Sequence, residues 1–220
     1  DMARIGYHAS HEQFKPGELL KWSLLAEESG FTAVSCSDHF HPWSRRQGES
    51  GFSFSWLGAA MQSLKVPCGM VCAPGQRYHP AIVAQAVATL CSMFPDRFWI
   101  ALGSGEALNE RITGQKWPAK AERNERLLEC TDVIRRLLSG ETVNHHGKVV
   151  VEEAKLYTLP VRIPLILGAA VTSASARWVG SWADGLITVH QPPQRQRLLP
   201  QHLWACRPAT AHAATARATA

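Results

Sequence analysis

The 220-residue sequence contains no apolar run that approaches the roughly 20 residues needed to cross a bilayer. Its first residues, DMARIGYHAS, lack the basic segment followed by an apolar segment that is typical of an export signal. The sequence therefore argues against a membrane protein and predicts a soluble, cytoplasmic one.

Neither the cysteines nor the distribution of charge indicates a particular binding partner. The six cysteines form no C-x-x-C pair, so we expect reduced and buried thiols. Residues 191–220 contain four arginines and no acidic residue, so that without them the net charge of +5 becomes 5 − 4 = +1. A nearly neutral body argues against a nucleic-acid partner.

Short apolar runs alternate with longer amphipathic ones along the chain. The pattern predicts strands at 4–9, 32–38, 68–74, 98–105, 164–170 and 185–190, and helices at 16–29, 54–64, 79–94, 120–138 and 173–182. Strands that alternate with helices indicate crossover connections and hence a parallel α/β sheet.

Two α/β architectures fit this order, an open doubly wound sheet and a barrel. The first strand is not followed by the glycine-rich turn of a dinucleotide-binding fold. Polar residues instead follow nearly every strand, among them His8, Asp38, Gln76, Glu106 and His190. In a barrel these strand ends surround one mouth, so we favour a (β/α)8 TIM-barrel type of fold.

About six strand–helix units are too few to close an eight-stranded barrel. After His190 the sequence becomes rich in Ala, Thr, Arg and Pro and loses its alternating pattern. We expect residues 1–190 to form an incomplete barrel domain and residues 191–220 to form a low-complexity, poorly ordered tail. The chain is interpreted as a truncated copy of a longer protein or as a shortened variant.

The stretch VSCSDHFHPW places Asp38, His39, His41 and Trp43 at the end of one strand. An H-x-H pair after a barrel strand is also how some hydrolases hold zinc. His190 could add a ligand, but a further acidic ligand would have to come from strands that the chain lacks. We therefore expect no metal, and a metal-dependent hydrolase remains the alternative function.

The stretch ALGSGEALNE predicts a second contribution to the site. Gly103 and Gly105 allow the backbone to approach a ligand closely, and Glu106 follows in a turn. Glu106 is either an acid that faces a planar cofactor or a residue that begins a helix. The stretch CAPGQRYHP, 72–80, is interpreted mainly as a strand-to-helix connection.

These stretches, together with FPDRFWIALGSGEALNE and WADGLITV, resemble the luciferase-like flavin and deazaflavin oxidoreductases from about residue 4 to residue 189. Within that family they resemble the branch that includes a deazaflavin-dependent glucose-6-phosphate dehydrogenase. The resemblance implies a TIM-type barrel that binds coenzyme F-420, a deazaflavin, in its mouth. FMN is the alternative cofactor, because GYHASHEQF is similar to a sub-branch suspected of using a flavin.

The resemblance also implies roles for individual residues. It makes His39 the base at the substrate hydroxyl, with Trp43 beside it, and Glu106 the acid that handles the proton on the reduced ring. The expected cofactor contacts are Asp38, a non-proline cis peptide at Val71–Cys72, Asn109, and the backbone of Gly168, Ala169 and Ala170 around a phosphate.

Hydride transfer requires a planar acceptor held about 3–3.5 Å from the donor carbon, and a histidine near its usual pKa suits removal of the alcohol proton. We expect the neighbouring Asp38 to fix the tautomer of His39. The sixth strand is followed by His190 and Gln191 where the sugar-phosphate enzyme has a lysine, which argues against glucose 6-phosphate. The expected substrate is a small alcohol or carbonyl compound; an inactive binding remnant and a homodimer are left open.

Overall fold

The structure is a computed structural model, and it describes residues 4–189. Its elements are β1 (Gly6–Ala9), α1 (Pro16–Glu28), β2 (Ala33–Cys36), α2 (Ser53–Ser63), β3 (Cys68–Cys72), α3 (Pro80–Met93), β4 (Phe98–Leu102), α4 (Ala107–Glu110), a 3-10 turn η1 (Arg111–Thr113), α5 (Lys120–Leu138), β5 (Val143–His146), β6 (Val150–Ala154), β7 (Ile166–Ala169), α6 (Ser173–Val179) and β8 (Gly185–Ile187). All six predicted strands and all five predicted helices are present, with ends shifted by a few residues.

The main sheet contains six parallel strands in the order β1-β2-β3-β4-β7-β8. Its strands therefore follow one another in space as they do in the chain, without the reversal of order that defines a doubly wound sheet. Parallel strands added in one direction are the arrangement of a (β/α) barrel, so the prediction of a barrel type is confirmed. β1 and β8 are the two edges of the described sheet.

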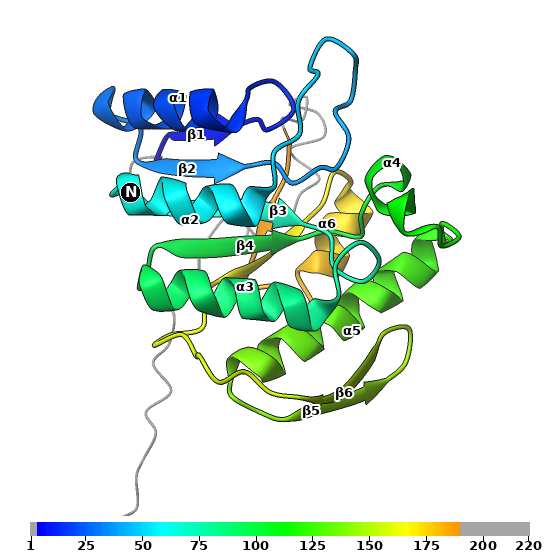
Figure 1. The fold of residues 1–220 in the computed structure, drawn as a ribbon. Coiled ribbons are helices and arrows are strands. Elements are labelled where there is room, and N and C mark those ends of the chain that lie inside the picture. Colours follow the sequence, from blue (N-terminus) through cyan, green and yellow to red (C-terminus); the bar gives the residue numbers. More distant parts are fainter. Residues whose placement is uncertain (1–3, 190–220) are drawn as a thin grey trace, which may run out of the picture.

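The helices lie side by side on the outside of this sheet (Figure 1), with contacts between α1 and α2, α2 and α3, and α3 and α5. Proline starts both α1 and α3, where the missing N–H group is not needed. The core between the layers is built from aliphatic and sulfur-containing side chains such as Leu57, Met70 and Ile100, all without exposed surface. The strands alternate between this core and the opposite, concave face.

The antiparallel hairpin β5–β6 was not predicted from the sequence. Its strands are short, and VNHH carries polar residues that do not mark a strand. The hairpin is stabilised by α5: Glu129 on that helix accepts hydrogen bonds from the Lys148 and Val149 backbone N–H groups and lies 2.9 Å from His145 Nε2. Contacts between distant segments therefore select this structure.

Two further predictions have clear outcomes in the described residues. The five cysteines between residues 4 and 189 are unpaired and buried, as expected. The predicted cis peptide at Val71–Cys72 is wrong, because residues 4–189 contain no cis peptide bond. β3 stays regularly paired with β4 up to Cys72 and Leu102, and a trans peptide is the low-energy form in such a strand.

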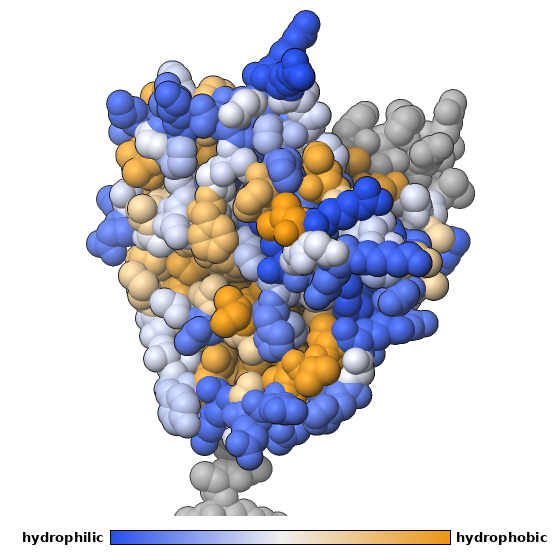
Figure 2. Space-filling view, turned by 45° about the vertical axis from the view of Figure 1, so that its right-hand side comes forward, coloured by the Kyte–Doolittle hydropathy of each residue, from blue (hydrophilic) through white to orange (hydrophobic). Residues whose placement is uncertain are grey.

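The predictions about His190, Cys206 and the 191–220 tail lie outside the described residues. None of the helices that the structure describes combines the length and apolar character needed to span a membrane. Figure 2 brings the side of α5 and the β5–β6 hairpin forward and shows long hydrophilic side chains there, with apolar patches between them.

Candidate active site

A cavity of about 530 Å³ lies at the carboxyl ends of the six parallel strands. Eight residues predicted from the sequence line it: Asp38, His39, Val71, Cys72, Glu106, Asn109, Ala169 and Ala170. Trp43 and Gly168 were also predicted but do not line it. The strand ends thus bring together residues that are up to 132 positions apart between Asp38 and Ala170.

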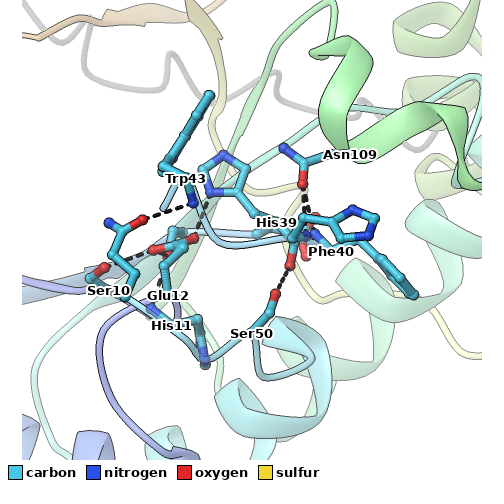
Figure 3. Close-up of polar contacts among 12 residues, drawn as sticks. Ser10, His11, Glu12, His39, Phe40, Trp43, Ser50 and Asn109 are labelled. Carbon is cyan, nitrogen blue, oxygen red and sulfur yellow. Dashed lines mark hydrogen bonds and ion pairs between the residues drawn. The ribbon is translucent and has the colours of Figure 1, made fainter. Parts of the chain in front are cut away.

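His39 is held by a carboxylate that sequence reasoning missed. Its Nδ1 lies 2.5 Å from Oε1 of Glu12, whose side chain is only 3% exposed. The second oxygen of Glu12 accepts hydrogen bonds from Ser10 Oγ at 2.7 Å and from Ser37 Oγ at 2.8 Å (Figure 3). Three donors therefore converge on one buried carboxylate.

These contacts keep Glu12 ionised. Burial alone would raise the pKa of Glu12, but the hydrogen bonds, that from His39 foremost, outweigh it and lower the pKa to about 2. Burial acts in the opposite direction on His39 and would lower its pKa, but the hydrogen bond and charge of Glu12 raise that pKa above the ordinary value. An ionised carboxylate can only accept, so Nδ1 of His39 carries a proton and Nε2 is left for chemistry.

Glu106 approaches the other ring nitrogen of this histidine. Its Oε2 lies 3.9 Å from Nε2 of His39, and its side chain is half exposed. Burial raises the pKa of Glu106, and the charge of His39 offsets this only in part. Glu106 precedes α4 but makes no side-chain capping bond there, which favours an acid facing the cavity over a residue that merely begins a helix.

Asn109 fixes the loop that carries His39. Its Oδ1 accepts hydrogen bonds from the backbone N–H groups of Phe40 at 2.9 Å and His41 at 3.0 Å. Asn109 is buried, and its Nδ2 makes no hydrogen bond of good geometry within residues 4–189. Its side chain still lies close enough to the carboxyl group of Glu106 to act against the rise in the pKa of that group.

Trp43 lies beside His39 as expected, although outside the cavity lining. The two rings meet edge to face, with centroids 5.1 Å apart and an interplanar angle of 77°. Trp43 is 53% exposed, on the loop that follows β2. It can therefore cover His39 from the solvent side.

The prediction that Asp38 fixes the tautomer of His39 is wrong, because both oxygens of Asp38 have other partners. Oδ1 accepts from the Tyr78 hydroxyl at 2.9 Å, and Oδ2 accepts from Arg77 Nη2 at 3.0 Å. Arg77 also lies 3.5 Å from the buried Glu110 through Nε, and its backbone N–H donates to that carboxylate. Asp38 thus belongs to a buried charge network that joins the ends of β2, β3 and β4.

The residues predicted to receive a phosphate also have structural roles. A Cβ on Gly168 would lie 2.3 Å from Cγ1 of Val179, so glycine is needed there for α6 to pack on β7. The N–H of Ala170 donates to the carbonyl of Ile187 at 3.1 Å. The Ala170 amide is therefore used within the sheet, although Ala169 and Ala170 line the cavity.

The H-x-H pair does not converge on one point. His39 is directed to Glu12, whereas Nδ1 of His41 lies 3.1 Å from the carbonyl oxygen of Leu108. Within residues 4–189 no group of three or more His, Cys, Asp or Glu side chains is arranged to hold a metal ion.

A sheet wound in one direction, with a cavity of mixed apolar and polar lining at the carboxyl ends of its strands, defines an α/β-barrel type of protein with a site for a ligand. The family model for luciferase-like monooxygenases matches residues 1–217, and the chain belongs to this family.

The curated relatives and solved structures agree with this assignment. Two relatives are F420-dependent glucose-6-phosphate dehydrogenases, from Microbacterium testaceum and Nakamurella multipartita, where F420 stands for coenzyme F-420. Each is 42% identical to this chain over 189 residues, which cover 84% of this chain and 56% of the relative. An F420-dependent secondary alcohol dehydrogenase, solved with an F420-acetone adduct, is 36% identical with a TM-score of 0.84, over 88% of this chain and 60% of that one. The chain therefore spans little more than half the length of the curated relatives it matches.

Proposed function

We propose that this chain carries the active site of an oxidoreductase that transfers a hydride between a small alcohol or carbonyl compound and coenzyme F-420. The observation that carries the proposal is the buried, ionised Glu12, which holds the Nδ1 proton of His39 and leaves Nε2 as a base. The relatives described above, which are F420-dependent dehydrogenases, support the choice of cofactor.

The lining of the cavity fits such a cofactor. One wall is made of small or apolar residues, including Val71, Cys72, Ala169 and Ala170, against which a planar ring can pack. Asn109 and Glu106 supply polar side chains on the wall beyond β4. When bound, coenzyme F-420 supplies a deazaflavin ring that accepts or donates a hydride.

The residues of the chain would handle the protons. His39 would accept the hydroxyl proton of an alcohol at Nε2, and Glu12 would stabilise the imidazolium that forms, as carboxylates do in other histidine pairs. Glu106 has a raised pKa, so it can hold and release a proton within the cavity. Trp43 would shield His39 from bulk water.

The substrate is proposed to be a small alcohol or ketone rather than glucose 6-phosphate. The lysine that helps to hold the sugar phosphate in the similar enzyme is replaced in this sequence by His190 or Gln191, which lie outside the described residues. The alcohol dehydrogenase of known structure, solved with its acetone adduct, is consistent with a substrate of that size.

The experiment is a binding titration followed by turnover. The chain is mixed separately with coenzyme F-420 and with FMN, binding is followed by fluorescence, and secondary alcohols or glucose 6-phosphate are then added while the visible absorbance of the oxidised cofactor is recorded. We expect coenzyme F-420 to bind and to be reduced by an alcohol, and His39→Ala to bind it without turnover. Failure of both cofactors to bind would refute the proposal. Tight binding of FMN alone would mean that the cofactor is FMN and not coenzyme F-420.

A further inference from the structure

One cation in the cavity is not explained by the proposed proton chemistry. Lys120 is the one lysine or arginine among the described residues of the lining. Its Nζ donates to Ser104 Oγ at 2.5 Å, and none of the ion pairs within residues 4–189 includes it. Lys120 is exposed, so its ammonium group lies at the cavity wall in reach of solvent and without a counter-ion among these residues.

Helix stability does not account for a lysine at this position. Lys120 is the first residue of α5, where the exposed N–H groups of the helix carry partial positive charge and favour an acid. Burial and then the charge of Arg123 lower the pKa of Lys120, so its surroundings oppose the positive charge. A negatively charged ligand group would remove both unfavourable effects.

The acidic residues of the cavity cannot serve as that counter-ion, because they have other partners. Asp38 and Glu110 both pair with Arg77, and Glu106 lies toward His39. Lys120 is therefore a lining cation without a carboxylate partner in the described residues, although the lining contains three carboxylates.

Ser104 adds a second donor at the same place. Its oxygen accepts from Lys120, so its own hydroxyl hydrogen remains available, and the ammonium group has two further hydrogens to donate. Ser104 lies between Gly103 and Gly105 directly after β4, and a Cβ on Gly103 would lie 3.5 Å from Cβ of Ala169. The backbone that carries Ser104 is thus close to the end of β7, and Ser104, Lys120, Ala169 and Ala170 all line the same cavity.

We propose that Lys120 and Ser104 bind the phosphate group in the side chain of the cofactor, an inference that rests on the proposed function. The oxygens of a phosphate group that carries one or two negative charges can accept hydrogen bonds from an ammonium group and from a hydroxyl at once. The site selects for a cofactor with a phosphate on its side chain over the same ring system without one. Lys120 and Ser104 also supply hydrogen-bond donors for the phosphate, whereas the amide of Ala170 is already bonded within the sheet.

The test compares ligands with and without the phosphate-bearing part of the side chain, and in the pair FMN and riboflavin the phosphate is the only difference. Dissociation constants are measured for coenzyme F-420 and for its deazaflavin with the ribityl chain but no phosphate, using the wild-type chain, Lys120→Met, Lys120→Arg and the control Lys116→Met. Lys116 is exposed, in the same segment, and outside the cavity lining. FMN and riboflavin form a second matched pair.

We expect Lys120→Met to weaken binding of coenzyme F-420 by about tenfold, the usual effect of one charge-assisted hydrogen bond, and to leave the phosphate-free compound unchanged. Lys120→Arg should keep most of the affinity, because arginine also binds phosphate. Lys116→Met should change neither constant. Added salt should weaken the binding of the phosphate-bearing ligand only.

Several results would overturn the inference. An equal loss for both ligands would mean that Lys120 shapes the cavity, and no loss for either would mean that it does not touch the ligand. An unchanged cofactor affinity with a raised KM for a phosphorylated substrate would assign the site to the substrate. In all three cases coenzyme F-420 still binds and the proposed function stands, whereas absence of binding by every ring compound would refute both.

Discussion

Replacing Glu12 by glutamine should change the proton affinity of His39 while preserving the shape of the side chain. In the wild-type chain the carboxylate lies 2.5 Å from Nδ1 and holds the pKa of His39 above its ordinary value. The amide has no charge and can donate as well as accept, so it neither stabilises the imidazolium nor selects one tautomer. We expect the pKa of His39 to fall in Glu12→Gln, because burial then acts against only the weaker charges of Glu106 and Asp38.

The same substitution should lower stability by an amount that depends on pH. The pKa of Glu12 is about 2 in the folded chain against an ordinary 4.5, a difference that corresponds to ~3 kcal/mol. Because the folded-state value is the lower one, this stability is fully present above pH 4.5 and is lost as the pH falls toward 2. The gap between wild type and Glu12→Gln should be ~3 kcal/mol at pH 6 and about half of that at pH 3.

Two measurements check this reasoning without requiring turnover. Urea unfolding from pH 3 to pH 7 gives the stability gap, and NMR titration of the His39 ring gives its pKa in each variant. Glu28→Gln is the matched control, because Glu28 is an exposed acid at the end of α1. If the pKa of His39 were the same with glutamine at position 12, Glu12 would not act on His39 and the proposed mechanism would lose its central contact. In a chain that turns over, the variant should also lose about 10²-fold or more in rate.

Three further outcomes are expected. Glu106→Gln should slow reduction of the bound cofactor by about 10²-fold or more with little change in its affinity, measured by rapid mixing; an unchanged rate would make Glu106 a structural residue only. Gly168→Ala should destabilise the chain by ~1–3 kcal/mol in thermal or urea unfolding, because its methyl group would overlap Val179, whereas Gly17→Ala, where a Cβ meets nothing within 4 Å, should not. Elemental analysis should find less than one zinc per chain, and one zinc that is lost in His39→Ala would favour the hydrolase.

The sequence by itself determined the class of fold and most of the residues around the cavity. Apolar runs that alternate with amphipathic segments report burial directly, so the six strands of the main sheet and five of the six α-helices of the described region could be read from them. Parallel strands end on the same side, which is why polar residues after successive strands, such as Asp38 and Glu106, predicted a shared cavity.

Only the tertiary structure decided which of these residues act on each other. Asp38 is next to His39 in sequence, yet its carboxylate is turned to Arg77 and Tyr78, while Glu12, 27 positions away, holds the histidine. Sequence proximity does not fix the direction of a side chain at a strand end, because that direction depends on which donors the neighbouring strands bring. Glu12 could have been suspected from its place just after β1. The role of Lys120 could not, because it depends on the packing of α5 beside the loop that follows β4.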